Sequence, residues 1–213
     1  MVRADRRTGK AKRVQSAPVL PEEVLDRAAS MFLSQGYYRT RMSDIADSFG
    51  VTHAALYYHF QNKQDILSQI NKRAITELLN RARGIVAAER APRDTLLELV
   101  KAHLAYVAES PAFVATLLEH DLEIPAEEFA DIQDMRRDYT EIFVATYDKA
   151  KAAGEVPEVD SNLAVSLLIG ACNWVYRWYH PGGGMGPDEL VEQAMVLLGS
   201  ITGSNGPRRR SRS

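Results

Sequence analysis

Apolar residues recur along the chain with the three- and four-residue spacing of α-helices, in segments that proline and glycine separate. In the first segment, Pro21 suits a first helical turn and Gly36 is expected to end the helix. The apolar face of this segment consists of Val24, Leu25, Ala28, Met31 and Phe32. No segment shows the alternation and hairpin turns of β-strands. The pattern predicts an all-α protein of about nine helices.

After Gly36 the pattern breaks into two short segments and a long one. The short segments are TRMSDIADSFG and VTHAALYYHF, and the long one starts at Asn62 and runs to about Glu89. Asn62, with Asp65 three residues later, resembles a capping box. The chain shows no repeat of fixed period, which argues against a helical solenoid. The remaining helices are expected near residues 93–109, 112–120, 126–153, 160–179 and 187–200.

The two short segments have the pattern of a helix-turn-helix. Gly50 supplies the left-handed residue that a sharp turn needs, and Thr52 can cap the second helix. Leu56 and Phe60 lie four residues apart and can face the core. The other positions carry small, aromatic and polar side chains, which suits a helix that enters the major groove of DNA. An isolated helical corner is the alternative for this segment taken alone.

The formal net charge of −2 hides a strong polarisation of charge along the chain. Residues 1–13 carry six basic residues and one acid, and residues 207–213 carry four arginines. Positions 14–206 are acidic, with 16 basic and 27 acidic residues. We therefore expect basic, disordered tails at residues 1–19 and 204–213 around an acidic body. Such tails can serve solubility alone, so they indicate a DNA partner only beside a DNA-binding motif.

Three further features bear on cellular location. The single cysteine, Cys172, lies in an apolar stretch, excludes an intrachain disulfide and fits a reducing compartment. The longest uncharged run, residues 161–176, is shorter than a membrane span, which takes roughly 20 apolar residues. The basic N-terminus leads into PVLPEEVLDRAA rather than the apolar core of a secretory signal. A cytoplasmic protein with no membrane partner is expected.

A longer set of motifs around the helix-turn-helix resembles that of a known protein family. Its parts are GYYRT at 36–40, DIA at 44–46, FGVT at 49–52, LYYHF at 56–60 and KQDIL at 63–67. Together they resemble the DNA-binding domain of the TetR family of transcriptional regulators. The resemblance implies a three-helix DNA-binding domain at residues 20–67 and a larger helical domain for effector binding and dimerisation at residues 68–203. It also implies a homodimeric repressor that binds a near-palindromic DNA operator and is released by a small-molecule effector.

The resemblance also assigns DNA contacts to residues of this sequence. The groups expected at the DNA backbone are Thr40, Thr52, Tyr57, His59 and Lys63. The groups expected at the base edges are His53, Ala54 and Ala55, and Arg41 and Tyr58 complete the predicted set. Family members often have lysine at position 53 and glycine at position 54. The operator of a relative therefore cannot be carried over to this chain.

The basic arm supplies the charge that the motif lacks. Residues 20–67 contain four bases and six acids, whereas DNA binding gains much of its affinity from contacts between cations and phosphates. The arm directly precedes the first helix, and arms of other helix-turn-helix proteins contact an adjacent groove. We expect much of the salt-dependent affinity to come from Arg6, Arg7, Lys10, Lys12 and Arg13.

The C-terminal segment predicts a surface for self-association. A nearly apolar helix around LAVSLLIGACNWV is followed by a glycine-rich turn and an amphipathic helix. Such a pair can form half of a four-helix interface with a second copy. The expected interface residues are Trp174, Trp178, Leu190, Ala194 and Leu197. The alternative is that the two tryptophans fill the core of one subunit.

The same segment is similar to the last helices of TetR-like repressors of fatty-acid, sterol and aromatic-acid breakdown, several of which respond to acyl-coenzyme A thioesters. That likeness implies an apolar tunnel for an acyl chain and cations for phosphates. The predicted lining residues are Phe113, Leu117, Leu118, Phe129, Ile132, Phe143 and Leu168, and the predicted phosphate partners are Arg136 and Arg137. Each of these can instead belong to the core or to the solvated surface.

No pattern in the sequence predicts a catalytic site, a metal or a cofactor. Cys172 has no base near it in the sequence, and no Ser/His/Asp pattern with a local signature occurs. Glu119, His120, Asp121 and Glu123 are rich in metal-ligand types, but neighbours one or two apart on a helix diverge. Two alternatives stay open: a helical enzyme or carrier whose N-terminal module is only structural, and a regulator that answers to a protein or to no ligand.

Overall fold

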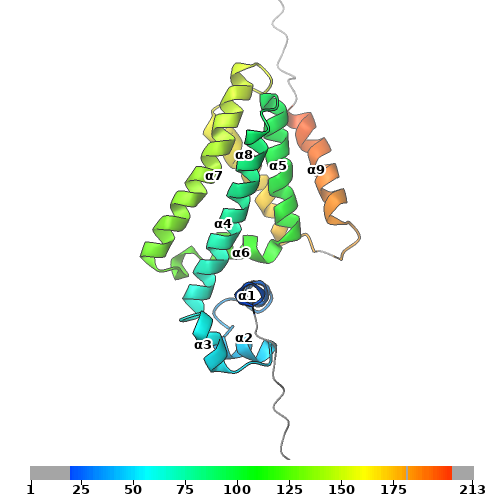
Figure 1. Ribbon diagram of the computed structural model, residues 1–213. Coiled ribbons are helices and arrows are strands. Elements are labelled where there is room, and N and C mark those ends of the chain that lie inside the picture. The colour runs from blue at the N-terminus through cyan, green and yellow to red at the C-terminus, as the bar shows by residue number, and fades with distance from the viewer. Residues whose placement is uncertain (1–19, 181, 203–213) are drawn as a thin grey trace, which may run out of the picture.

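The structure, a computed structural model, describes residues 20–180 and 182–202. Within this part of the chain, all regular elements are helices, nine of them α-helices, as the sequence predicts. Figure 1 shows two tiers joined by one long helix. The lower tier contains α1 (Pro21–Gln35), α2 (Met42–Ser48) and α3 (His53–His59), and α4 (Lys63–Ala87) leads upward. The upper tier adds α5 (Pro92–Glu109), α6 (Pro111–Glu119), η1 (Asp121–Glu123), α7 (Ala126–Ala152), α8 (Ser161–Asn173), η2 (Trp174–Arg177) and α9 (Pro187–Thr202).

The predicted helix-turn-helix is present in the lower tier. Gly50 joins α2 to α3 at a φ of 64°, in the left-handed region that glycine adopts without strain. Thr52 caps α3, since its hydroxyl oxygen accepts a hydrogen bond from the backbone N–H of Ala55 at 3.3 Å. Leu56 and Phe60 are buried, with 2% and 1% of their surface exposed. These two side chains fix α3 to the tier and turn its remaining residues outward.

The start of α4 differs in one detail from the predicted capping box. The side-chain oxygen of Asn62 accepts from the N–H of Asp65 at 2.8 Å, as expected for an N-cap. The carboxylate of Asp65, however, accepts from the N–H of Gln61 at 2.8 Å. In a capping box, this carboxylate would accept from the N–H of Asn62 itself. Here it binds the residue before Asn62 and so stabilises the turn that precedes the helix.

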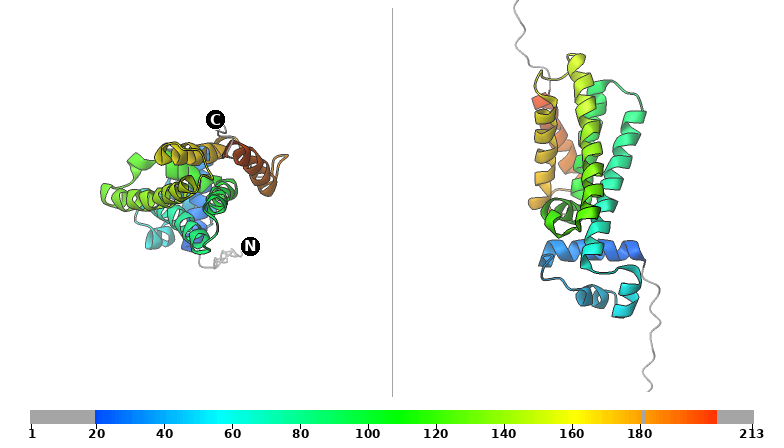
Figure 2. Two further views of the ribbon diagram at one scale, coloured as in Figure 1. Left: turned by 90° about the horizontal axis from the view of Figure 1, so that it is seen from above. Right: turned by 90° about the vertical axis from the view of Figure 1, so that its left-hand side faces the viewer.

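The upper tier is a helical bundle that rests on the lower one. The helices α4, α5, α7 and α8 pack together, α9 packs on α5, and α6 crosses beneath them and packs against α1 (Figures 1 and 2). One apolar core runs through both tiers. Because α4 continues without a break through residue 67, the proposed division of the chain at residues 67 and 68 falls within a helix. That division remains a proposal.

The helix expected at 160–179 is shorter in the structure. The α-helical part ends at Asn173, and residues 174–177 tighten into the 3₁₀ turn η2, a common ending for an α-helix. Tyr179 still donates its N–H to the carbonyl of Val175 at 2.9 Å, and both side chains are buried. None of the helices in the described ranges combines the length and apolar character that a membrane-spanning helix needs. The predicted basic tails lie outside these ranges.

Candidate nucleic-acid interface and effector cavity

Most of the predicted DNA contacts lie together on the outer face of α3. Tyr57 and Tyr58 are 52% and 85% exposed, although tyrosine rings usually contribute to a core. The other exposed positions of this helix are His53, Ala54, Ala55 and His59. The face therefore offers aromatic, imidazole and methyl groups to a partner.

Two neighbouring groups extend this face. Thr52 is exposed, and its hydroxyl accepts one hydrogen bond within the helix cap, which leaves the hydroxyl proton free to donate. Arg41 precedes α2 and is exposed, while its backbone N–H is held by the carboxylate of Asp44 at 2.8 Å. Both side chains stand where a phosphate oxygen can approach them.

Thr40 and Lys63 do not join this face. The side chain of Thr40 is fully buried, and its hydroxyl donates to the carbonyl of Gly36 at 3.0 Å. The ammonium of Lys63 donates to the carbonyls of Tyr37 and Thr40 at 2.7 and 2.9 Å and lies 4.1 Å from the centre of the Tyr37 ring. In this conformation the turn at 36–40 uses the hydroxyl of Thr40, and the phosphate contact of Thr40 stays a prediction. Lys63 keeps one of its three N–H donors for a partner.

The turn at residues 36–40 is also fastened to the upper tier. The hydroxyl of Tyr38 donates a hydrogen bond to the carboxylate of Glu123 in η1, and this bond raises the pKa of Tyr38. The ring of Tyr37 lies 5.3 Å from that of His120, which directly precedes η1. A shift of η1 would therefore move or release the loop that leads from α1 to α2.

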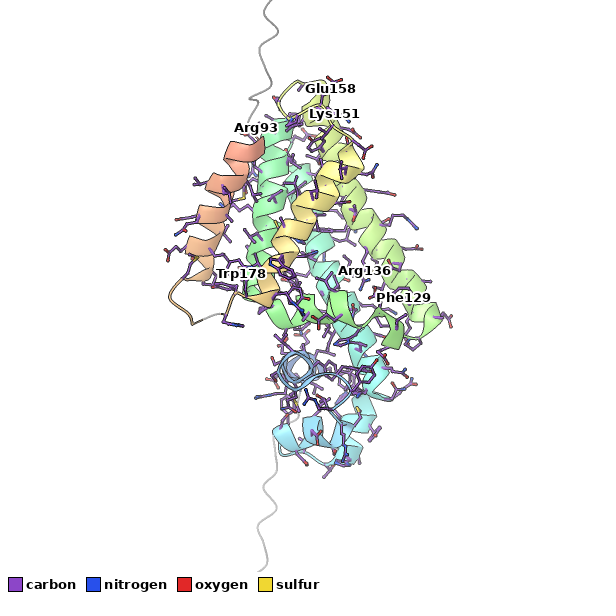
Figure 3. All side chains as sticks on the ribbon, turned by 180° about the vertical axis from the view of Figure 1, so that it is seen from behind. Arg93, Phe129, Arg136, Lys151, Glu158 and Trp178 are labelled. Atoms are coloured by element: carbon purple, nitrogen blue, oxygen red, sulfur yellow. The ribbon has the colours of Figure 1, made fainter. Side chains whose placement is uncertain are left out.

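A partly open cavity of about 150 Å³ lies in the upper tier, between α4, α5, α6, α7 and α8. Six of its lining residues are apolar: Ile75, Leu78, Val114, Leu117, Leu118 and Ile169. The polar ones are His103, Arg136, Tyr139, Thr140 and Asn173. Figure 3 marks Arg136 at the lower end of the upper tier. A larger hollow of about 460 Å³, around Lys151 and Glu158, is an open depression at the far end of α7 (Figure 3).

The cavity includes three of the nine predicted effector residues, Leu117, Leu118 and Arg136. Phe113, Ile132 and Phe143 are instead buried at 8%, 0% and 1% exposure as parts of the general core. Phe129 and Leu168 are partly buried against that core and do not line the cavity. Arg137 is exposed and bound to Asp134 at 2.6 Å. The sequence pattern identified apolar helix faces, but it did not distinguish residues at the cavity from those packed elsewhere.

The cavity has a polar wall that the sequence analysis missed. His103 donates from Nε2 to the side-chain oxygen of Asn173 at 3.0 Å, because that oxygen can only accept. Its Nδ1 then accepts from the hydroxyl of Tyr139 at 2.9 Å. Burial lowers the pKa of His103 from its ordinary value to about 4 and raises the pKa of Tyr139. Both groups are therefore uncharged near neutral pH.

The buried imidazole makes stability depend on pH. In the unfolded chain His103 titrates near its ordinary pKa of 6.5, whereas in the folded protein it stays neutral down to a pH of about 4. The unfolded state therefore binds more protons between these values, so this contribution is complete above pH 6.5 and is lost as the pH falls. We expect urea unfolding to show a loss of about 3 kcal/mol from this group between pH 7 and pH 4. In His103→Gln, which retains an N–H donor, that part of the pH dependence should vanish; an unchanged dependence would refute the assignment.

Arg136 connects the cavity to η1. Its guanidinium donates to both oxygens of Asp121 at 2.9 Å, to the side-chain oxygen of Asn71 at 3.1 Å and to the carbonyl of Leu117 at 2.6 Å. Its Nε is buried and has no hydrogen-bond partner in the described part of the chain. One side chain thus borders the cavity, holds α6 to α7 and fixes η1, which in turn contacts Tyr38.

The acidic cluster around η1 has no metal-binding geometry. Glu119 accepts from Tyr176 and Arg177 at 2.8 and 2.7 Å, whereas Asp121 is held by Arg136. Among the residues that the structure describes, no three His, Cys, Asp or Glu side chains gather as a metal site would require. The carboxylates instead bind three different parts of the protein.

The end of α8 and the outer face of α9 expose large apolar side chains. Trp174 and Trp178 are 63% and 52% exposed, so they are not core residues of one subunit. Figure 3 labels Trp178. Leu163 and Leu167 on α8 and Leu197 on α9 are exposed at 57%, 66% and 63%. Leu190 is only 5% exposed and Ala194 is partly covered. These last two predicted interface residues belong to the packing of α9 on its own subunit.

Comparison with known proteins places these features in a family. Residues 24–70 match the model of bacterial regulatory proteins of the tetR family, and residues 89–201 match the tetracyclin repressor-like C-terminal domain. The HTH-type transcriptional repressor KstR2 of Rhodococcus jostii is 28% identical over 83% of this chain and 87% of its own length.

Solved structures agree with this result. A transcriptional regulator of the TetR/AcrR family from Thermobifida fusca is 33% identical, with a TM-score of 0.67 over 89% of this chain and 98% of its own. AibR, solved with isovaleryl coenzyme A and operator DNA, shares the fold at 22% identity, with a TM-score of 0.74 over 83% of this chain and 96% of its own. With one family model on the helix-turn-helix and a second over the upper tier, the chain belongs to the TetR family of transcriptional regulators.

Proposed function

We propose that this protein is a homodimeric transcriptional repressor that binds a near-palindromic operator through α3 and is released by a small acyl thioester. The observation that carries the proposal is the exposed face of α3, held in position by the buried Leu56 and Phe60. A helix fixed in this way can enter the major groove, with Ala54 and Ala55 short enough to let it approach the base edges. Tyr57, His59 and Thr52 then contact the flanking backbone.

The exposed apolar side chains of α8, η2 and α9 form the proposed dimer surface. A second copy would cover Leu163, Leu167, Trp174, Trp178 and Leu197, which otherwise expose large hydrophobic areas to water. The contact would be isologous, because the same two helices meet their own copies across a two-fold axis. Two α3 helices related by that axis require an operator with the same symmetry.

A gel-shift experiment with the DNA that flanks the protein's own gene tests the operator proposal. We expect a specific complex that Tyr57→Ala weakens, because this exposed side chain contributes little to the fold. Catalytic turnover together with a failure to bind any segment of that DNA would favour an enzyme or a carrier. Burial raises the pKa of the Cys172 thiol to about 11 and keeps it protonated, so we propose no role for this thiol as a nucleophile.

The N-terminal arm is expected to supply long-range attraction to the operator. Residues 1–13, which lie outside the described ranges, carry six basic residues. Deleting them should lower the slope of log K against log salt by about one unit for each phosphate that the arm neutralises. Fluorescence anisotropy at several salt concentrations measures this slope, and the full-length chain is the reference. An unchanged slope would show that the arm binds no phosphates.

AibR, whose solved complex contains isovaleryl coenzyme A, supports an acyl thioester as the effector. In this chain the acyl group would enter the cavity beside Arg136 and Asn173. Since Arg136 holds Asp121 and η1 contacts the turn at 36–40, we propose that an occupied cavity shifts η1 and moves the lower tier. The ligand would then favour the arrangement in which the two α3 helices no longer fit successive major grooves.

Removing the hydroxyl of Tyr38 is expected to weaken this coupling. Tyr38→Phe loses the hydrogen bond to Glu123 but keeps the ring, so the operator affinity of the free protein should change only a few-fold. Release by the effector should become several-fold weaker, because coupling free energies of about 1–3 kcal/mol rest on such contacts. The matched control is Tyr147→Phe, which loses one hydrogen bond to Pro157 at the far end of α7. Equal responses of both variants to the effector would contradict the path through η1.

A further inference from the structure

We infer that the cavity selects a short, uncharged acyl group whose carbonyl oxygen accepts a hydrogen bond from the side-chain amide of Asn173. This inference rests on the proposed function and narrows the effector by size and by charge. It distinguishes acyl esters and thioesters from the corresponding free acids, and short acyl groups from long ones.

The size of the cavity limits the acyl group. The volume of about 150 Å³ matches that of an apolar protein cavity that stays dry and holds one benzene molecule. Six apolar side chains line it, among them Leu78 and Ile75 of α4 and Ile169 of α8. A branched or cyclic group of about benzene size would fill this space. A long chain would have to displace well-packed side chains.

A hydrogen-bond donor at the cavity is left unpaired by the described residues. Nε of Arg136 has no hydrogen-bond partner among the described residues, but it is fully buried and a ligand in the cavity cannot reach it. Asn173 uses its side-chain oxygen for His103, and its amide nitrogen has no partner among the residues that the structure describes. The hydroxyl of Tyr139 already donates its proton to His103. A ligand therefore gains most by presenting an acceptor oxygen here.

The charges around the cavity favour a neutral acceptor over a carboxylate. The guanidinium of Arg136 is already neutralised by its two bonds to Asp121. Burial keeps His103 uncharged, with a pKa of about 4. A buried carboxylate would thus find no cation of its own, and such a charge is costly to desolvate. A carbonyl oxygen makes the same hydrogen bonds without that cost.

The rest of the ligand can remain outside. Leu118 lines the cavity and is 43% exposed, so the cavity reaches the surface at the end of α6. The next residue, Glu119, is paired with the exposed Arg177 at 2.7 Å. An acyl group inside the cavity can therefore be attached through its thioester to a polar carrier beyond Leu118.

The probes are free isovalerate and the N-acetylcysteamine thioesters of isovaleric and octanoic acids, with affinities measured by calorimetry. The isovaleryl thioester is expected to bind at least about tenfold more tightly than either isovalerate or the octanoyl thioester. Equal or tighter binding of isovalerate would show that a carboxylate takes Arg136 from Asp121 and would overturn the inference on charge. Tighter binding of the octanoyl probe would overturn the inference on size.

Two neighbouring leucines of α4 provide a matched pair of variants. Leu78 and Leu79 are 4% and 3% exposed, but only Leu78 lines the cavity. Both alanine variants lose stability, whereas only Leu78→Ala should move the preference toward the octanoyl thioester. The inference fails if Leu79→Ala moves the preference equally, or if Leu78→Ala leaves it unchanged.

Operator binding by the same wild-type sample distinguishes a failure of the ligand inference from a failure of the proposed function. A protein that binds its operator but none of the thioesters would overturn the inference on the ligand and leave DNA binding standing. A protein that binds no operator would overturn the proposed function itself, whatever the probes do.

Discussion

Replacing Ala54 with glutamate is expected to abolish specific operator binding and to leave the fold unchanged. Ala54 is exposed in the first turn of α3, where a carboxylate is favourable to the helix. On DNA, the same carboxylate would stand among phosphates and base-edge acceptors. If each subunit loses about 2 kcal/mol of binding free energy, the dimer loses about 4 kcal/mol, which lowers the operator affinity roughly a thousandfold.

Ala145→Glu is the matched control for this variant. Ala145 is an exposed alanine within α7, so its replacement adds the same charge to the upper tier. Anisotropy with a labelled operator should separate the two variants, while thermal melting should not. Retained affinity in Ala54→Glu would mean that α3 does not face the DNA.

A double substitution on the proposed dimer surface is expected to produce monomers. Leu167 and Leu197 are 66% and 63% exposed, so Leu167→Glu with Leu197→Glu leaves the core of each subunit intact. In a dimer the same four carboxylates would be buried against one another, which is prohibitive without partners. The operator affinity should fall by about a thousandfold or more, because each monomer can hold only one half-site.

Leu33→Glu serves as the control for the double variant. Leu33 is 44% exposed on α1, away from α8 and α9. Sedimentation velocity of the wild type should show a dimer, the control should do the same, and the double variant should sediment as a monomer. A double variant that remains dimeric would place the interface on another face.

The sequence predicted the helices and the DNA-binding motif because both depend on local patterns. Gly50, Thr52, Leu56 and Phe60 play the roles that the spacing indicates. The side chain of Thr40 is turned inward for a physical reason: its hydroxyl donates to the carbonyl of Gly36 within the turn at 36–40. A family pattern marks the position but does not say which way the side chain points.

The cavity could not be predicted in the same way. It is formed by single residues from five helices, and a helix face shows only that a residue is apolar, not what lies opposite. Phe143 and Leu117 are both apolar residues at helical spacing, yet Phe143 lies in the core and Leu117 lines the cavity. The available signal was His103, a polar residue among the apolar positions of its helix, where a buried side chain needs a partner such as Asn173.

The charge distribution agrees with an end-on approach to DNA. The upper tier belongs to the strongly acidic stretch of residues 68–206, which carries 12 basic and 21 acidic residues and should be repelled by phosphates. Residues 20–67 are much closer to neutral, and the basic arm immediately precedes them. Repulsion of one tier and attraction through the arm would together orient the dimer with α3 toward the duplex.

We propose that two copies of α3 bind one symmetric operator. Footprinting of the wild-type protein on the DNA that flanks its own gene tests this most directly. We expect one protected segment with two-fold symmetry, whose half-sites are about 34–36 Å apart along the helix axis. The isovaleryl thioester should remove that protection. An absence of protection anywhere on this DNA, or protection without two-fold symmetry, would contradict the claim.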